Sequence, residues 1–163
     1  MQNIIKFIQD NLNSNYVYDE SNIEKLDKDD YLTIKNMFDL NNSFQPLLTL
    51  VYDVNNRLFI YEWIDIEDDI EYSLYIELDK ELFKRYLNKE IEEYHLFDNP
   101  VKGIYYIELA SLHRRVEDVY EQYRVKNLTI PDYSIKLDDY YESGDVDITL
   151  HNVKIEDFIE KEI

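Results

Sequence analysis

Carboxylates are the chemically active side chains that gather in this sequence, and they gather twice. The first group is Asp65, Glu67, Asp68, Asp69 and Glu71, and the second is Asp138, Asp139, Glu142, Asp145 and Asp147. Acids two residues apart on a strand project from one face about 6.6 Å apart, so they present a row of negative charge. Three interleaved tyrosines, Tyr72, Tyr140 and Tyr141, would add contact area with a polar hydroxyl. We interpret both groups as candidate partner-binding surfaces, and the alternative for each is a solvated turn.

The sequence gives little support for catalysis or for a bound cofactor. Its three histidines, His95, His113 and His151, lie far apart, and no H-E-x-x-H, G-x-S-x-G or dinucleotide-binding motif occurs. Only Gly103 and Gly144 could let the backbone approach a phosphate closely. A carboxylate pair of the glycosidase type stays open, because 36 acidic residues make any single pair uninformative. We expect no catalytic residue, no cofactor and no metal site.

One acidic loop can be compared with the calcium-binding loop of an EF-hand. Asp139 at position one, Gly144 at position six and Asp145 at position seven agree with that template. Position three is Tyr141 and position twelve is Leu150, where the template requires an oxygen ligand and a bidentate glutamate. The comparison favours an acidic turn between strands over a calcium site.

The net charge of -19, from 36 acidic and 17 basic side chains, limits the classes of partner. Nucleic acids and anionic membranes both attract clustered lysine and arginine, so we expect no direct binding to either. A protein with a basic surface is favoured, because opposite charge steers its approach. Solubility alone is the alternative reason for the charge. The one compact basic group, His113, Arg114 and Arg115, is interpreted as an intramolecular partner for the acids.

Length and composition indicate a single acidic domain. The 163 residues are 45% hydrophobic and 15% aromatic, which is enough to bury a core. The absence of cysteine excludes disulfides and thiolate metal sites. No apolar run approaches the roughly 18 residues of a membrane span, and the first residues lack the features of a signal peptide. We therefore expect a cytoplasmic protein.

The stretch 47–78 predicts an antiparallel meander of three strands. Asn55 and Asn56 supply a hairpin turn, because asparagine tolerates the left-handed conformation. The second strand, residues 57–64, is apolar on both faces and is expected to be central, with four large side chains buried: Leu58, Phe59, Ile60 and Trp63. The third strand, residues 71–78, alternates between apolar and polar residues, which predicts one face in contact with water.

The flanking elements complete an α+β fold in which the mostly antiparallel sheet is built on this meander. Helical spacing predicts a helix over residues 2–12, and Asp79 is expected to cap a helix over residues 80–90. Further helices are predicted over residues 21–26, 29–38, 91–97, 112–125 and 155–163, with a strand left open for 112–125. Alternation predicts further strands over residues 102–109, 133–137 and 145–150.

Part of the chain carries an ordered series of segments: PLL at 46–48, RLFIYEWID at 57–65, YSLYIEL at 72–78, a short helix, LNKEIEEYHLF at 87–97 and GIYYIE at 103–108. The series resembles a family of small uncharacterised bacterial proteins, over about residues 44–108. In that family a P-x-L-F-like strand, a strand ending in W-x-D, a strand leading into a helix and a closing aliphatic strand follow one another. Asn55 and Asn56 stand where the family has a glycine. The resemblance implies a fold and no activity.

These observations favour a non-enzymatic binding protein. The first hypothesis is an acidic inhibitor or immunity-type antagonist that occupies the basic surface of a nuclease or another nucleic-acid-binding protein, as a DNA mimic in an anti-defence role would. A structural or regulatory subunit that binds a protein without such mimicry is the second hypothesis. An enzyme with a carboxylate site is the third. Salt-sensitive binding would separate the first two, and a bound substrate or metal would indicate the third.

Overall fold

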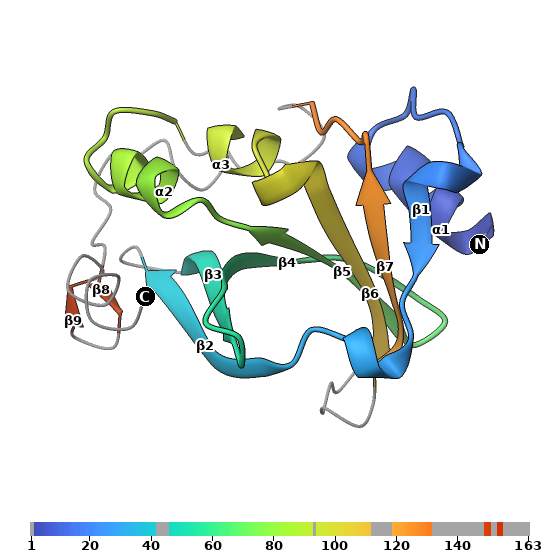
Figure 1. Cartoon of the computed structure of the whole chain (residues 1–163), viewed down its shortest axis with the longest axis horizontal. Helices are drawn as coiled ribbons and strands as arrows, with labels where there is room; N and C mark the ends of the chain where they lie inside the picture. The colour runs from blue at the N-terminus through green and yellow to red at the C-terminus, as the bar shows by residue number, and fades with distance from the viewer. Residues whose placement is uncertain are drawn as a thin grey trace.

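The computed structural model describes residues 2–41, 46–92, 94–111, 119–131, 149–150 and 153–154. Within these residues the main feature is a curled antiparallel sheet with the strand order β1-β7-β6-β5-β4-β3-β2 (Figure 1). The strands are β1 Ile23–Lys25, β2 Ile34–Asn41, β3 Pro46–Asp53, β4 Leu58–Glu67, β5 Ile70–Glu77, β6 Ile104–Ser111 and β7 Val119–Lys126. A second, two-stranded sheet pairs β8 Thr149–Leu150 with β9 Val153–Lys154. The predicted α+β class with a mostly antiparallel sheet is confirmed.

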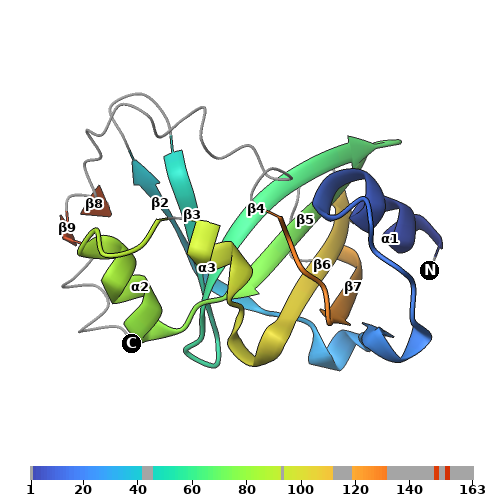
Figure 2. The ribbon, with the colours of Figure 1, turned by 90° about the horizontal axis from the view of Figure 1, so that it is seen from above.

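Three short helices lie on the same face of the seven-stranded sheet, which we call the first face. They are α1 Gln2–Phe7, which continues as the π-helical turn η1 Ile8–Leu12, α2 Lys80–Leu87 and α3 Tyr94–Asp98. Figure 2 shows all three in front of the strands. Asp79 Oδ1 accepts a hydrogen bond from the Leu82 N–H at 3.0 Å, so the predicted cap of α2 is confirmed. The remaining helical turns are the 3₁₀ segments η2 Glu20–Asn22, η3 Lys28–Asp30 and η4 Val101–Gly103.

The predicted meander is confirmed and is longer than expected. β3, β4 and β5 pair in order, and β2, β6 and β7 extend the same antiparallel series. The turn between β3 and β4 contains Asn56 at φ 62°, the left-handed conformation expected there. The predicted strand over 102–109 is β6, and the predicted helical turn over 91–97 is α3.

The larger core lies between the first face and the helices. Its sheet side consists of alternating residues of the central strands, such as Ile60, Leu74 and Ile107, all fully buried. Ile8 of η1 and Phe83 of α2 pack onto them. Since burying a leucine, isoleucine or phenylalanine stabilises a fold by roughly 1.5–3 kcal/mol, this cluster is the main source of stability.

The opposite, second face of the sheet has a smaller core of its own. Phe59, Tyr75 and Tyr106 are buried there under Leu26 and Leu32, which come from the segment between β1 and β2. Tyr75 is fully buried and its neighbour Ser73 nearly so, although both belong to the face of β5 that was expected to meet water. That expectation is wrong, because the segment after β1 crosses over the sheet and covers this face.

Three predicted helices are wrong. Residues 21–26 form η2 followed by β1, and residues 29–38 include η3 and the start of β2. In the third, predicted over 112–125, residues 119–126 form β7, the strand that was left open. The reason is pairing: β1 and β6 both hydrogen-bond to β7, and β2 hydrogen-bonds to β3. These ladders outweigh the weak helical spacing.

The prediction that Trp63 is buried is also wrong, since 52% of its surface is exposed. Leu58, Phe59 and Ile60 are buried as expected. Several predictions lie outside the described residues: the strand over 133–137, residues 145–148 of the predicted 145–150 strand, the helix over 155–163, and residues 112–118 of the predicted 112–125 helix. Residues 149–150 of the predicted 145–150 strand form β8.

Candidate partner-binding surface

The turn between β4 and β5 holds two acids at its outermost point. Glu67 pairs with Ile70, which leaves Asp68 and Asp69 as a two-residue turn with φ values of 53° and 62°. A two-residue hairpin turn with two left-handed residues matches the twist of the flanking strands, and it usually contains asparagine or aspartate followed by glycine. This chain has an acid at both positions.

A β-bulge before the turn decides which side chains each face receives. Trp63 pairs with Ser73, and Asp65 pairs with Tyr72, so Ile64 is the extra residue of β4. Alternation therefore places Asp65 on the first face with Tyr72. Ile66 pairs with Glu71, which places Ile66, Glu71 and Trp63 together on the second face.

The second face of β4 becomes more exposed toward the turn. Phe59 is fully buried, Tyr61 is partly buried, and Trp63 and Ile66 are 52% and 41% exposed. The reason is that the segment carrying Leu26 and Leu32 covers only part of this face. Its cluster includes Phe59 and Tyr61 but does not include Trp63. We call this end of the hairpin the hairpin surface. It consists of Trp63, Ile66 and the five acids of residues 65–71, of which Asp65 projects from the first face. Exposed large apolar residues beside charges are typical of interaction sites.

The acids of the hairpin produce a concentrated negative potential. The pKa of Tyr72 is raised, first by burial and then by the charges of Glu67, Asp65, Glu121 and Asp68. Tyr72 itself is only 5% exposed and its ring stacks on Phe7 of α1, with the ring centroids 5.1 Å apart. Little of Tyr72 is therefore exposed to a partner, and the acids that act on its hydroxyl come from β4, the turn after it and β7.

Two residues of β7 join this end of the sheet and were missed in the sequence. Glu121 ion-pairs with Lys25 at 3.2 Å and accepts a hydrogen bond from the Tyr123 hydroxyl at 2.7 Å. Burial would raise the pKa of Glu121, but these two contacts lower it on balance, so the carboxylate stays charged. Tyr120 is 54% exposed. The period-two pattern in VYEQYRVK, read as a strand, would have indicated both.

Glu108 is a buried acid in the middle of the second face, with 1% of its surface exposed. Its carboxylate accepts hydrogen bonds from the Tyr75 hydroxyl at 3.1 Å and from the Gln122 amide at 2.7 Å. The Gln122 side-chain oxygen in turn accepts from the Leu32 N–H at 2.8 Å. This network ties the covering segment to β6 and β7, which gives the buried acid a structural role.

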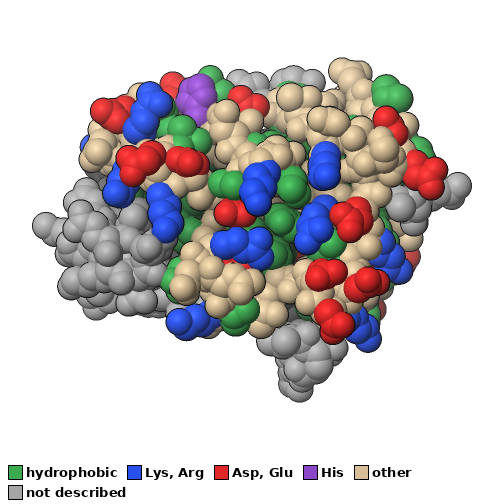
Figure 3. All heavy atoms as spheres, viewed as in Figure 1, with side chains coloured by type: hydrophobic (Ala, Val, Ile, Leu, Met, Phe, Trp, Pro, Cys, Tyr) green, Lys and Arg blue, Asp and Glu red, His purple; other side chains and the backbone are tan. Residues whose placement is uncertain are grey.

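Basic side chains gather on a different part of the surface. Figure 3 shows Lys and Arg across the middle of the view, where β5 ends and β6 begins. The Arg57 guanidinium lies 2.9 Å from Asp53 Oδ2 and 4.0 Å from Glu77, and Arg124 lies 3.5 Å from Glu24. These acids offset much of the positive charge, so the cluster offers little attraction for an anion.

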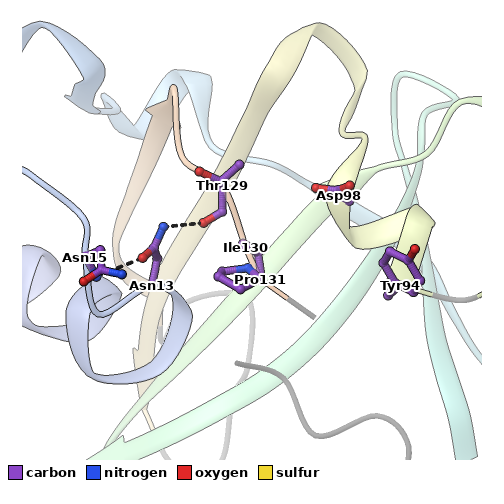
Figure 4. Close-up of a pocket in the computed structure, with 7 residues that line it drawn as sticks. All are labelled: Asn13, Asn15, Tyr94, Asp98, Thr129, Ile130 and Pro131. Atoms are coloured by element: carbon purple, nitrogen blue, oxygen red, sulfur yellow. Dashed lines mark hydrogen bonds between the residues drawn. The ribbon is translucent and has the colours of Figure 1, made fainter. Parts of the chain in front are cut away.

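Hollows lie near the helices in the described part of the chain. The one in Figure 4, about 370 Å³, lies between the turn after η1 and α3, and it is lined by Asn13, Asn15, Tyr94, Asp98, Thr129, Ile130 and Pro131. The Asn13 amide donates to the Thr129 carbonyl at 3.0 Å and accepts from the Asn15 N–H at 2.9 Å, so its polar groups join two chain segments. Another hollow, about 580 Å³, lies between α2 and α3 and includes Arg85 and His95.

The structure describes only one of the two predicted acidic surfaces. The second group, Asp138, Asp139, Glu142, Asp145 and Asp147 with Tyr140 and Tyr141, lies outside the described residues, as do the calcium-like turn, His113, Arg114, Arg115 and His151. Among the described residues, no three histidine, aspartate or glutamate side chains come together in a way that could hold a metal ion. No described helix is long and apolar enough to cross a membrane.

Comparison with protein-family models, with curated proteins and with solved structures finds no match for this chain. The resemblance over residues 44–108 therefore stays a prediction.

Proposed function

We propose that this protein is a non-enzymatic acidic antagonist whose hairpin surface occupies the basic surface of a nuclease or another nucleic-acid-binding protein. The observation that supports it best is the pairing of an exposed Trp63 with five acids in the seven residues 65–71. Protein interfaces depend on a few anchors, in which tryptophan is enriched, surrounded by a polar rim. Trp63 and Ile66 correspond to the anchors, and the carboxylates correspond to the rim.

The charge indicates the kind of partner. A surface that binds nucleic acid is lined with lysine and arginine, and an acidic hairpin meets the same positive potential as a phosphate backbone does. A protein of charge -19 is also drawn to such a surface from a distance, which speeds the encounter. An antagonist of this kind would block the nucleic acid by competing for its binding surface.

The first experiment is capture from the native host with the whole chain as bait, with and without the Trp63→Ala substitution. We expect a basic nucleic-acid-binding protein to be captured by the wild-type chain. Loss of a central anchor should weaken binding roughly 30-fold, mainly through faster dissociation. Tyr18→Ala is the matched control, because Tyr18 is an exposed aromatic residue, 40% accessible, far along the chain from the hairpin.

The second experiment measures association kinetics with the captured partner. Glu67→Gln, Asp68→Asn and Asp69→Asn together should slow association roughly tenfold at low salt, because exposed charges steer the encounter and are screened beyond roughly 8 Å at physiological ionic strength. The control has the same change of charge elsewhere, at three exposed acids near α2: Glu81→Gln, Glu90→Gln and Glu92→Gln.

A partner whose binding is indifferent to salt and to the hairpin substitutions would contradict the proposal. The charge would then serve solubility alone, and a structural or regulatory subunit would be the better description.

A further inference from the structure

Trp63 and Glu71 lie diagonally across two paired strands on the same face. Trp63 pairs with Ser73 and Ile66 pairs with Glu71, so these four residues form the corners of one small area of the sheet. Diagonal neighbours on a sheet are about 7–8 Å apart, within reach of long and aromatic side chains. An indole, an aliphatic side chain and a carboxylate therefore border the same area.

Within the described residues these groups are open to a ligand: Trp63 and Ile66 are exposed, and Glu71 is partly exposed. More than half of the Trp63 surface is exposed. Among the described residues, no aromatic ring or cation packs against its indole. Within the described part of the chain, the Glu71 carboxylate has no lysine, arginine or hydrogen-bond donor as a partner. The Asp65 carboxylate, which belongs to the first face, instead accepts a hydrogen bond from the Ile66 N–H at 2.9 Å.

We propose that Trp63, Ile66 and Glu71 form a cradle for an arginine side chain of the partner. This deepens the proposed function and rests on it. A guanidinium group is flat and weakly hydrated, so it stacks on an indole face while its N–H groups pair with a carboxylate. The acids at positions 67–69 add an attractive potential around the cradle. A lysine ammonium is compact and strongly hydrated, so it uses the charge but gains less from the ring.

The chain contains a single tryptophan, so all tryptophan emission comes from Trp63 in the cradle. The probes are an oligoarginine peptide and an oligolysine peptide of equal length, titrated into the whole protein at physiological salt. Both carry the same charge, so general attraction to an acidic protein affects both equally. We expect the arginine peptide to change Trp63 emission and to bind roughly fivefold more tightly than the lysine peptide.

Substitutions then test the geometry. Glu71→Gln should make the two peptides bind nearly equally. Glu81 is an exposed acid on α2, and Glu81→Gln should leave the ratio of the two peptide affinities unchanged. Trp63→Leu should also remove the preference for arginine, while a salt-dependent attraction to both peptides remains. Peptide binding to this variant is measured by calorimetry. The wild-type comparison requires no substitution, so a variant that fails to fold does not prevent the test.

Equal binding of the two peptides to the wild-type protein, or arginine binding without a change in Trp63 emission, would overturn the cradle. The proposed antagonist function would survive that result if capture still found a salt-sensitive basic partner. Conversely, an arginine preference that Glu71→Gln removes would support the cradle even if no nucleic-acid-binding partner were captured.

Discussion

At the scale of single residues, Trp63 shows how exposure is decided by what covers a strand. Side chains along β4 alternate between the two faces, which places Trp63 with Phe59 on the second face. Yet Phe59 is fully buried and Trp63 is half exposed. Both are large and apolar, and both lie on a central strand. They differ in exposure because the segment that carries Leu26 and Leu32 covers only the end of the face that contains Phe59.

Stability measurements should reproduce this difference. We expect Phe59→Ala to lower the free energy of unfolding by about 3–5 kcal/mol, as loss of a fully buried ring does. Trp63→Ala should cost only about 1 kcal/mol, because half of the ring already contacts water. Urea denaturation of both variants measures the two costs, and equal costs would mean that Trp63 is packed in solution.

Glu62 is a residue whose charge should make stability depend on pH. Burial raises its pKa from 4.5 to about 7. Below about pH 4.5 the carboxyl is protonated in both the folded and the unfolded chain, so it costs nothing. Between 4.5 and 7 the unfolded chain ionises while the folded chain keeps the proton, so stability falls as pH rises, and the full cost is present above pH 7.

The substitution Glu62→Gln removes this cost. It should raise the free energy of unfolding by about 2 kcal/mol at pH 8 and leave it nearly unchanged near pH 4.5. Urea denaturation of wild type and variant at both pH values measures the difference. A gain of the same size at both pH values would mean that ionisation of Glu62 is not its cause.

At the scale of elements, the hairpin has an acid, Asp69, at the turn position where glycine is usual. Asp68 and Asp69 both adopt left-handed backbone conformations, which cost a residue with a side chain roughly 1 kcal/mol and cost glycine almost nothing. Adjacent acids also repel one another. A turn that keeps two charges at this cost is consistent with a binding role for the hairpin surface.

Replacement by glycine should therefore stabilise the fold. Asp69→Gly should raise the free energy of unfolding by roughly 0.5–1 kcal/mol, while Asp69→Asn, which removes the charge but keeps a side chain, should gain less. Thermal melts of the two variants separate backbone strain from repulsion. If both variants gained equally, charge and not conformation would be the cause.

At the scale of the whole molecule, the acidity opposes folding. A net charge of -19 places many like charges close together in the compact state, and the unfolded chain relieves that repulsion. The described ion pairs join mostly exposed partners, such as Lys25 with Glu121 and Arg85 with Glu90. They therefore contribute little to the free energy of unfolding.

Added salt should therefore stabilise this protein. Raising sodium chloride from low concentration to about 0.2 M should increase the free energy of unfolding by about 1 kcal/mol, because the repulsion is screened. The variant with Glu81, Glu90 and Glu92 changed to glutamine should show a smaller increase. Urea denaturation across the salt series tests this, and a stability that falls with salt would contradict it.

The sequence by itself determined the features that depend on neighbouring residues. The period-two pattern predicts the meander, Asn55 and Asn56 predict its first turn, and Asp79 predicts the cap of α2, because each of these uses groups within a few residues. The charge and the acidic hairpin at residues 65–71 follow from composition and order alone.

Only the tertiary structure decided the features that depend on segments far apart in the chain. Residues 119–126 are a strand because β6 and β1 offer them hydrogen-bonding partners. Glu121 joins the hairpin acids because β7 runs beside β6. Trp63 is exposed because the segment after β1 covers the other end of its face. Exposure is a property of what packs above a residue, and that neighbour lies some thirty positions or more away along the chain.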